Sequence, residues 1–327
     1  MSQLRLDPLT GRWVVVSVDR AARPQAFATR SLPVQADHDR PCPFCPGNEE
    51  ATPPELERYG PKGEWLVRVV PNLYPAFGGT EAMTVTNLGP VFTQAPASGL
   101  HEVVIFSPEH DGSWADLTDA EATLVMTAVR DRIDEHASLP TVRYSQFITN
   151  CGREAGASIE HPHGQLLAMP FVPGELVDEQ AGFDRFEGAC LLCTTVEAEM
   201  ESGHRLVHVD EEVVAVCPFW SGTPYEMLLL PRVHSAFVNR AGAGSVESMG
   251  RAIRDALLRL RRVAGDVAYN IVLHTAPFRS TTEFHWHVHV LPKVTTPAGF
   301  ELGTGVFINV LPPEVAAAEL RAAGGGE

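Results

Sequence analysis

The sequence lacks a membrane-spanning run, a secretory leader and an excess of positive charge. No apolar stretch approaches the length that crosses a bilayer, and the first residues contain no apolar segment of the kind a signal peptide requires. We therefore expect a cytoplasmic protein. Asp and Glu number 41 against 25 Lys and Arg, a formal net charge of −16. This argues against nucleic acid or an anionic membrane as a partner, so any bound phosphate must be held by a few local groups.

Cysteine is also scarce, and its placement is informative. The chain has 6 cysteines, four of which form two C-x-x-C pairs. In a reducing compartment such pairs indicate a metal site before a disulfide. Cys151 and Cys217 stand alone and are expected to be buried, inert thiols. With 327 residues, 44% of them hydrophobic, the chain is long and apolar enough for one large globular domain or two.

The chemistry of the chain centres on two histidines in the segment His161-Pro-His163-Gly-Gln165. A strand is predicted before them, over residues 144–150, and in strand-like backbone two side chains at i and i+2 lie on the same face. One imidazole can then bind a metal while the other faces a ligand, with Gly164 leaving space in front of it. A lone His-x-His is more often part of an ordinary polar loop, so this motif needs support from elsewhere in the chain.

That support comes from a repeat. His110 precedes His161 by 161 − 110 = 51 residues, and His234 precedes His285 by 285 − 234 = 51 residues. Each interval contains one predicted helix and one predicted strand, and each follows a strand that ends at a proline. The chain is therefore predicted to contain an internal duplication.

The predicted elements keep one order in the two halves, which we place at residues 1–178 and 179–327. A capping box at Thr118 and Glu121, followed by an apolar stripe, predicts the start of the first helix. The expected strands cover 64–70, 101–106, 144–150, 213–216, 226–230 and 267–273, with a hairpin over 4–18 and helices over 118–139 and 245–263.

Each half carries two cysteines and two histidines in the same order. The first set is Cys42, Cys45, His110 and His161, and the second is Cys190, Cys193, His234 and His285. Two thiolates and two imidazoles suit tetrahedral zinc. Because protein would fill all four positions, we expect structural zinc with no open position for water, which argues against a metal-dependent hydrolase. The alternative is unligated buried cysteines and unrelated histidines.

His163 is the candidate nucleophile. If His161 binds zinc, the imidazole of His163 is held beside a closed metal site, and a neutral imidazole can form a covalent phosphoramidate with an activated phosphorus. Gln165 has the next position on that face and can hydrogen-bond a phosphoryl oxygen, but it cannot act as an acid. A sugar phosphate expelled from a pyrophosphate would need no such acid. In the second half, Trp286 and Val288 flank the corresponding histidines, so that copy is predicted to be structural.

These residues resemble the galactose-1-phosphate uridylyltransferase family, in the histidine triad superfamily. The resemblance is carried by Asp7-Pro-Leu-Thr-Gly-Arg-Trp-Val, Arg20-Ala-Ala-Arg23-Pro, Phe106-Ser-Pro-Glu-His110, Asn150, Gly156-Ala-Ser158 and His161-Pro-His163-Gly-Gln165. It implies an α+β fold made of two histidine-triad-like halves, each an antiparallel sheet with a helix. It also implies a homodimer whose sites borrow residues from the partner chain.

The resemblance implies roles for individual residues as well. His163 would take the nucleotidyl group, with Gln165 against its phosphate. The implied substrate contacts come from Arg20, Arg23, Asn72, Asn150 and Ser158. The implied substrates are a nucleotide sugar and a sugar 1-phosphate, and the implied cofactor is zinc.

This chain departs from the family pattern at the second metal site and near the nucleoside. The best-studied branch uses a glutamate and three histidines, which would fall on Glu179, His274, His287 and His289. The second C-x-x-C resembles instead the branch that includes the plant ADP-glucose phosphorylase, and we favour the cysteine set. Asn72-Leu73-Tyr74 stands where uridylyltransferases have an Asn-Asp pair, and Phe300-Glu-Leu-Gly-Thr-Gly305 also resembles the divergent branch. The nucleobase and the acceptor therefore stay open.

The leading hypothesis is a ping-pong nucleotidyltransferase. His163 would take a uridylyl group from UDP-glucose, release glucose 1-phosphate and pass the group to galactose 1-phosphate. One alternative is ADP-sugar phosphorolysis or dinucleotide hydrolysis, for which His287 of the second triad is a second choice of nucleophile. Another is a zinc-stabilised protein that binds nucleotides without catalysis.

Overall fold

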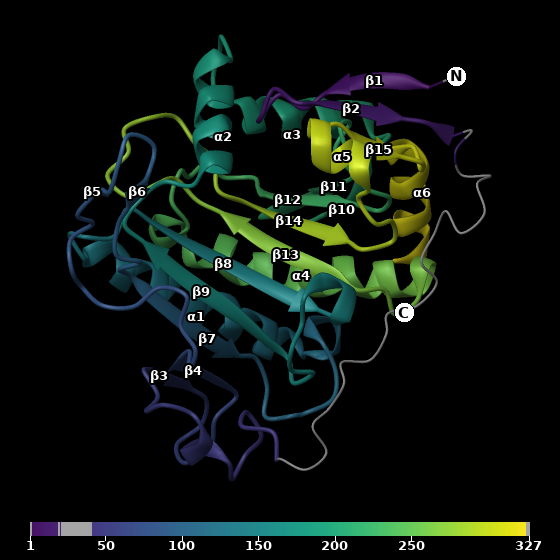
Figure 1. Cartoon of the computed structure of the whole chain (residues 1–327). Coiled ribbons are helices and arrows are strands. Elements are labelled where there is room, and N and C mark those ends of the chain that lie inside the picture. The colour runs from purple at the N-terminus through teal and green to yellow at the C-terminus, as the bar shows by residue number, and fades with distance from the viewer. Residues whose placement is uncertain (1, 19, 21–40, 325–327) are drawn as a thin grey trace.

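A single antiparallel sheet of ten strands forms the centre of the molecule (Figure 1). The structure is a computed structural model that describes residues 2–18, 20 and 41–324. In spatial order the strands are β10 (Leu206–Val209), β11 (Val213–Val216), β12 (Met227–Pro231), β14 (His287–Pro292), β13 (Tyr269–His274), β8 (Tyr144–Cys151), β9 (His163–Met169), β7 (Leu100–Ile105), β4 (Val67–Pro71) and β3 (Glu57–Tyr59).

The strand order repeats outward from the middle of this sheet. The first half runs β8-β9-β7-β4-β3 and the second runs β13-β14-β12-β11-β10. The halves meet where β13 pairs with β8, with Asn270 opposite Asn150. The predicted α+β fold of two histidine-triad-like halves is thus confirmed, and the halves share one sheet. The predicted boundary after residue 178 falls inside α2 (Gly174–Arg185), and the division there stays a prediction.

Two long helices, α1 (Asp119–Ser138) and α4 (Ala243–Ala264), cover one face of the sheet (Figure 1). The predicted capping box starts α1, because Thr118 Oγ1 accepts the Glu121 amide at 3.2 Å and Glu121 Oε2 accepts the Thr118 amide at 2.7 Å. The helices pack closely at Gly250 of α4, where a Cβ atom would lie 2.2 Å from the Ala122 carbonyl oxygen. The main apolar core lies between these helices and the sheet.

The opposite face is covered only in part, by α2, by α3 (Leu191–Ser202) and by a three-stranded sheet. That sheet contains the predicted hairpin, β1 (Gln3–Leu6) and β2 (Trp13–Val16), with β15 (Phe307–Asn309) parallel to β2. Because side chains alternate between the faces of a strand, every second residue of the central strands is left on this more open face.

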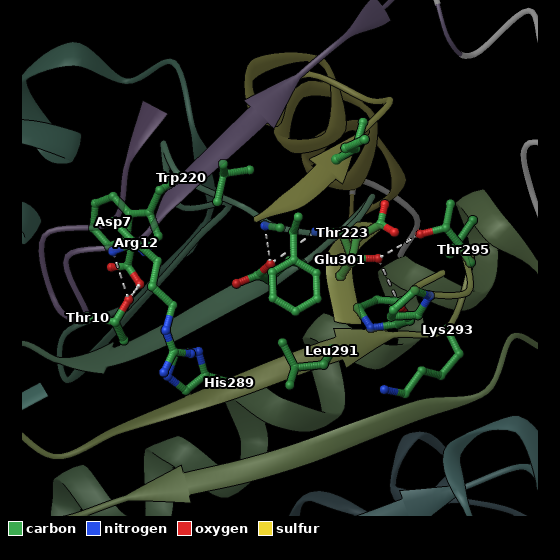
Figure 2. A pocket seen from close by; sticks show the side chains of 18 of the residues that line it. Asp7, Thr10, Arg12, Trp220, Thr223, His289, Leu291, Lys293, Thr295 and Glu301 are labelled. Carbon is green, nitrogen blue, oxygen red and sulfur yellow. Dashed lines mark hydrogen bonds between the residues drawn. The ribbon is translucent and has the colours of Figure 1, made fainter. Parts of the chain in front are cut away.

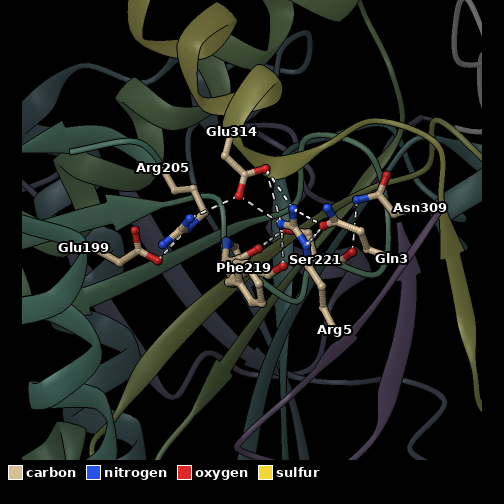
Figure 3. Close-up of polar contacts among 9 residues, drawn as sticks. Gln3, Arg5, Glu199, Arg205, Phe219, Ser221, Asn309 and Glu314 are labelled. Atoms are coloured by element: carbon tan, nitrogen blue, oxygen red, sulfur yellow. Dashed lines mark hydrogen bonds and ion pairs between the residues drawn. The ribbon is translucent and has the colours of Figure 1, made fainter. Parts of the chain in front are cut away.

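An ion-pair network fastens the two chain ends to the second half (Figure 3). Arg5 of β1 lies 3.0 Å from Glu314, which belongs to α6 (Pro313–Ala323). Arg205 lies 3.1 Å from the same Glu314 carboxylate and 2.8 Å from Glu199 of α3, so it links the two glutamates. The N-terminal strand and the last helix are therefore part of the folded unit.

Several elements were not predicted. The strands β9 and β14 begin at His163 and His287, so the second histidine of each motif opens a strand. The unpredicted helices are α2, α3, α5 (Gly299–Thr304) and α6, with 3-10 turns at Glu49–Ala51, Trp114–Asp116, Arg153–Ala155 and Val238–Arg240. A small exposed hairpin pairs β5 (Thr86–Asn87) with β6 (Thr93–Gln94). Within the described chain, none of the helices has the length and apolar character needed to traverse a bilayer.

Candidate functional site

The first predicted metal set comes together in the structure. The ligand atoms of Cys42, Cys45, His110 and His161 all lie within 4.8 Å of one another. His161 Nε2 is 2.8 Å from the Ser107 carbonyl oxygen, which can only accept, so this nitrogen carries the proton. The lone pair of His161 is therefore on Nδ1, which faces Cys42 Sγ at 3.9 Å and Cys45 Sγ at 3.7 Å.

The second set repeats this arrangement atom for atom. Cys190, Cys193, His234 and His285 form a group of the same size. His285 Nε2 is bonded to the Pro231 carbonyl at 3.0 Å, and its Nδ1 faces Cys190 Sγ at 3.6 Å and Cys193 Sγ at 3.4 Å. Both histidines at the start of the two motifs thus present the same nitrogen to a pair of thiols.

Both sets fit a zinc-type metal. Zinc–sulfur and zinc–nitrogen bonds of standard length at a tetrahedral angle place sulfur and nitrogen roughly 3.6 Å apart, close to the separations in both halves. Burial, together with the charge of the neighbouring thiol, raises the pKa of Cys45 to about 11. A bound cation would oppose this effect and favour the thiolate that zinc requires.

A third group lies in the second half. Glu179 of α2 meets His274, His287 and His289 with their ligand atoms within 4.8 Å. Three of these buried atoms, Glu179 Oε2, His287 Nε2 and His289 Nε2, have no hydrogen-bond partner in the described part of the chain, and such orphaned atoms fit a cation. The sequence presented this group and the cysteine set as alternatives for one site. The structure assembles both.

His163 is held in one tautomer. Its Nδ1 lies 2.7 Å from the His161 carbonyl oxygen, so Nδ1 donates and the lone pair is on Nε2. Burial lowers the pKa of His163, which favours the neutral ring. The ring of Phe44, from the first C-x-x-C turn, has its centroid 5.3 Å from that of His163. The first metal set therefore supports the imidazole from two sides.

Gly164 does not lie in front of the His163 imidazole, as the sequence suggested. The sequence suggested that it leaves space in front of His163, but it points to the opposite face of β9. A Cβ atom there would lie 2.6 Å from Phe147 and 2.9 Å from Phe106. Strand alternation explains the correction, because neighbours in a strand point to opposite faces. The glycine makes room for core aromatic rings.

The predicted polar residues lie beside His163 on the open face. Gln165 follows it two positions along β9, and Ile148 of β8 pairs opposite Gln165. Asn150 lies two residues beyond Ile148 on the same face. Sequence reasoning missed their neighbours His101 and Asn270, which contact Gln165 at 2.8 Å and Asn150 at 2.8 Å. Their signal was a polar residue in a mostly apolar strand, since β7 reads LHEVVI and β13 reads YNIVLH.

The remaining predicted substrate residues differ in placement. Asn72 follows β4 and lies next to His101, with its side-chain nitrogen 3.1 Å from His101 Nε2. Ser158 is exposed in the loop before β9. Arg20 lines a cavity between the N-terminal segment and the strands of the second half. Arg23 lies outside the described residues.

That cavity, of ≈ 1240 Å³, opens over the third metal group (Figure 2). Glu179, His274 and His289 line it, together with Arg12 and Lys293. His163 and Gln165 are not among its lining residues. The cavity over the third metal group is therefore separate from the candidate nucleophile.

Comparisons with known proteins agree with this architecture. A sequence profile described as galactose-1-phosphate uridyl transferase, N-terminal domain, matches residues 1–173. ADP-glucose phosphorylase of Arabidopsis thaliana is 33% identical over 333 residues, covering 98% of this chain and 92% of the relative. Galactose-1-phosphate uridylyltransferase of Thermotoga maritima is 28% identical over 335 residues, covering 98% of each.

Solved structures give the same result. The crystal structure of the Arabidopsis thaliana ADP-glucose phosphorylase with bound ADP-glucose superimposes with a TM-score of 0.83 at 30% identity, covering 98% of this chain and 99% of that one. A uridylyltransferase structure matches with a TM-score of 0.77 at 30% identity, covering 99% and 98%. Fold and site thus define an enzyme of the nucleotidyltransferase type. Within that class, the chain belongs to the galactose-1-phosphate uridyl transferase family.

Proposed function

We propose that this protein transfers a nucleotidyl group from a nucleotide sugar through a covalent intermediate on His163 Nε2. The observation that carries the proposal is the 2.7 Å hydrogen bond from His163 Nδ1 to the His161 carbonyl. It leaves Nε2 unprotonated on the open face of the sheet. Because His161 belongs to the first metal set, the residue that fixes the nucleophile's tautomer is itself held in place.

The reaction balances without an acid. Nε2 attacks the α-phosphorus, the bond from that phosphorus to the β-phosphate oxygen breaks, and hexose 1-phosphate leaves with the electron pair. The ring becomes cationic, and its proton stays on Nδ1, which donates it in a hydrogen bond to the His161 carbonyl. An oxygen of the acceptor then attacks the phosphorus, the P–N bond breaks, and the ring returns to its neutral form. Gln165, Asn150 and Asn72 supply neutral polar contacts on the same side.

For the substrate pair, we propose ADP-glucose as donor and inorganic phosphate as acceptor, with ADP as the second product. Support comes from the full-length similarity to the plant ADP-glucose phosphorylase. The second C-x-x-C and the segment Phe300-Glu-Leu-Gly-Thr-Gly305 also resemble that branch, and Asn72-Leu73-Tyr74 departs from the Asn-Asp pair of uridylyltransferases.

The second candidate is uridylyl exchange between UDP-glucose and galactose 1-phosphate. The profile match over residues 1–173 and the similarity to the Thermotoga maritima uridylyltransferase favour it. Both candidates use the same nucleophile and differ only in the base and the acceptor.

The test is rapid-quench labelling with ADP-glucose or UDP-glucose carrying a labelled α-phosphate. We expect an acid-labile, base-stable adduct on wild type and none on His163→Gln, with the faster donor identifying the base. Adding inorganic phosphate or galactose 1-phosphate to the adduct then identifies the acceptor. Wild type that forms no adduct with either donor would contradict the proposal.

The homodimer and the cytoplasmic location stay predictions. We propose the dimer from the family resemblance alone, and sedimentation velocity of the purified protein tests it. A species with the mass of one 35.5 kDa chain at micromolar concentration would count against it.

A further inference from the structure

Four polar side chains form a row across four neighbouring strands of the open face. They are His101 of β7, Gln165 of β9, Asn150 of β8 and Asn270 of β13, and these strands are adjacent in the order β7-β9-β8-β13. The pairings of β8 with β9 and of β8 with β13 put them on one face. The row crosses from the first half to the second, so the candidate site draws on both.

The oxygen of Gln165 is occupied by His101. The Ala76 amide donates to His101 Nδ1 at 3.0 Å, so Nδ1 carries the lone pair and Nε2 the proton. Nε2 then donates to Gln165 Oε1 at 2.8 Å. Consequently the NH₂ group of Gln165 is the end left for a ligand. Asn72 differs from Gln165, because its Oδ1 accepts the Tyr74 amide at 2.9 Å and its NH₂ group lies against His101 Nε2 at 3.1 Å, so that end is not free.

The oxygen of Asn150 is occupied by Asn270. One end of the Asn270 amide lies 2.9 Å from the Ala155 carbonyl oxygen, which can only accept, so that end is the NH₂ group. The same NH₂ group donates to Asn150 Oδ1 at 2.8 Å. Among the described residues, the NH₂ group of Asn150 therefore also has no hydrogen-bond partner.

We infer that His101 and Asn270 are positioning residues that hold Gln165 and Asn150 with their N–H donors towards the phosphoryl group at His163. An amide that is free to rotate offers either oxygen or NH₂ to a ligand. Only the NH₂ end stabilises the negative charge on phosphoryl oxygens, and donors already oriented need no rearrangement during the reaction. The inference rests on the proposed function and assigns no contact with substrate to His101 or Asn270.

The test compares variants that keep size but change donor and acceptor. In Asn270→Asp the donor is lost, so Asn150 must turn its NH₂ group to the new carboxylate and its oxygen to the ligand. We expect adduct formation from ADP-glucose or UDP-glucose to slow by at least about tenfold, less than the loss of a direct oxyanion donor. His101→Ala should slow it similarly, and His101→Gln, which again offers an N–H, should recover most of the rate.

The matched control is Asn87→Asp, the same change at an exposed asparagine of the β5–β6 hairpin whose Oδ1 accepts the Thr93 hydroxyl at 3.0 Å, and its rate should equal that of wild type. Two readouts separate positioning from a merely structural role. The effect of His101→Ala should largely disappear in a Gln165→Ala background. The rate ratio of the two α-phosphorothioate diastereomers of the donor should move towards one in Asn270→Asp and His101→Ala.

Equal slowing by His101→Ala with and without Gln165 would overturn the inference. So would wild-type rates for Asn270→Asp and His101→Ala in a protein that labels on His163, and in that case the proposed function would stand. If wild type forms no adduct with either donor, the proposed function and the inference both fail.

Discussion

The two halves of the molecule hold different side chains at corresponding positions of the same strand arrangement. Residues 124 positions apart correspond, as for His110 and His234 (234 − 110 = 124). The same shift carries the first-half residues Asn150, His163 and Gln165 onto the second-half residues His274, His287 and His289. The candidate nucleotidyl-transfer site therefore corresponds to the three histidines of the third metal group.

The second histidine of each motif has the same tautomer in both halves. His287 Nδ1 lies 2.8 Å from the His285 carbonyl, as His163 Nδ1 lies 2.7 Å from that of His161. The difference is Glu179 of α2, whose carboxylate is 3.8 Å from His287 Nε2 and accepts from His274 at 2.8 Å. His287 therefore has the same tautomer as His163, but its Nε2 faces the carboxylate of Glu179, which α2 places over the second motif.

The largest expected effect comes from exchanging the corresponding histidines for glutamine. His163→Gln should lower transfer by at least about 10³-fold, because it removes the nitrogen that bonds to phosphorus. His287→Gln should stay within about tenfold of wild type per folded molecule, since its Nε2 faces Glu179. Quenched labelling measures both, and loss of the adduct in His287→Gln with retention in His163→Gln would reverse the comparison.

The two cysteine sets give the next test. Cys45→Ser and Cys193→Ser should each lower the metal content by about one zinc per chain, measured by mass spectrometry of the elements, and each should lower the unfolding midpoint. Only Cys45→Ser should also slow adduct formation, because His161 of that set holds the tautomer of His163. An equal loss of labelling in both variants would contradict the expectation that only the first cysteine set supports His163.

A pair of corresponding glutamates also differs. Glu102 and Glu226 are related by the same shift (226 − 102 = 124). Among the described residues, only Glu102 of the two has an ion-pair partner, with Arg132 Nη2 at 2.6 Å, and His136 Nε2 lies 3.0 Å away. Burial alone would raise the pKa of Glu102, and hydrogen bonds from His136 and Arg132 outweigh it and keep that pKa below its ordinary value.

Glu102→Gln should therefore destabilise the fold. Removing one member of a buried ion pair costs about 3–5 kcal/mol at neutral pH. Arg132 would keep only exposed carboxylate partners such as Glu135, so we expect a cost near the lower end, about 3 kcal/mol. Because the pKa of Glu102 is depressed, its contribution is present above the unfolded-state pKa and is lost as the pH falls. Urea unfolding of both proteins at pH 7 and at pH 4 measures this, and a penalty of the same size at both values would contradict it.

Glu226→Gln should have the opposite and smallest effect. Burial raises the pKa of Glu226 to about 7, although the Gly222 and Thr223 amides donate to it. The native state then keeps a proton that the unfolded state releases, so stability falls as the pH rises from 4.5 to about 7. Gln keeps an acceptor for both amides and should stabilise by about 1 kcal/mol at pH 8, with little change at pH 5. Thermal unfolding at the two pH values checks the sign.

Local patterns explain why much of the fold could be predicted. The capping box at Thr118 starts α1 because both of its hydrogen bonds join residues three apart. The two metal sets could be found because cysteines and histidines are few and keep their spacing. The prediction for Gly164 was wrong because the strand that begins at His163 was not recognised. Without the bounds of that strand, the face on which each residue lies is undetermined.

By itself, the sequence determined that the chain is duplicated, that each half has its own pair of thiols and pair of imidazoles, and that His163 lies outside the first metal set. These features depend on residue type and spacing. Only the tertiary structure decided that Glu179 closes the second triad, and that His101 and Asn270 hold two amides by their oxygens. Those contacts join residues far apart in the chain, and packing of strands and helices alone brings their atoms within hydrogen-bond distance.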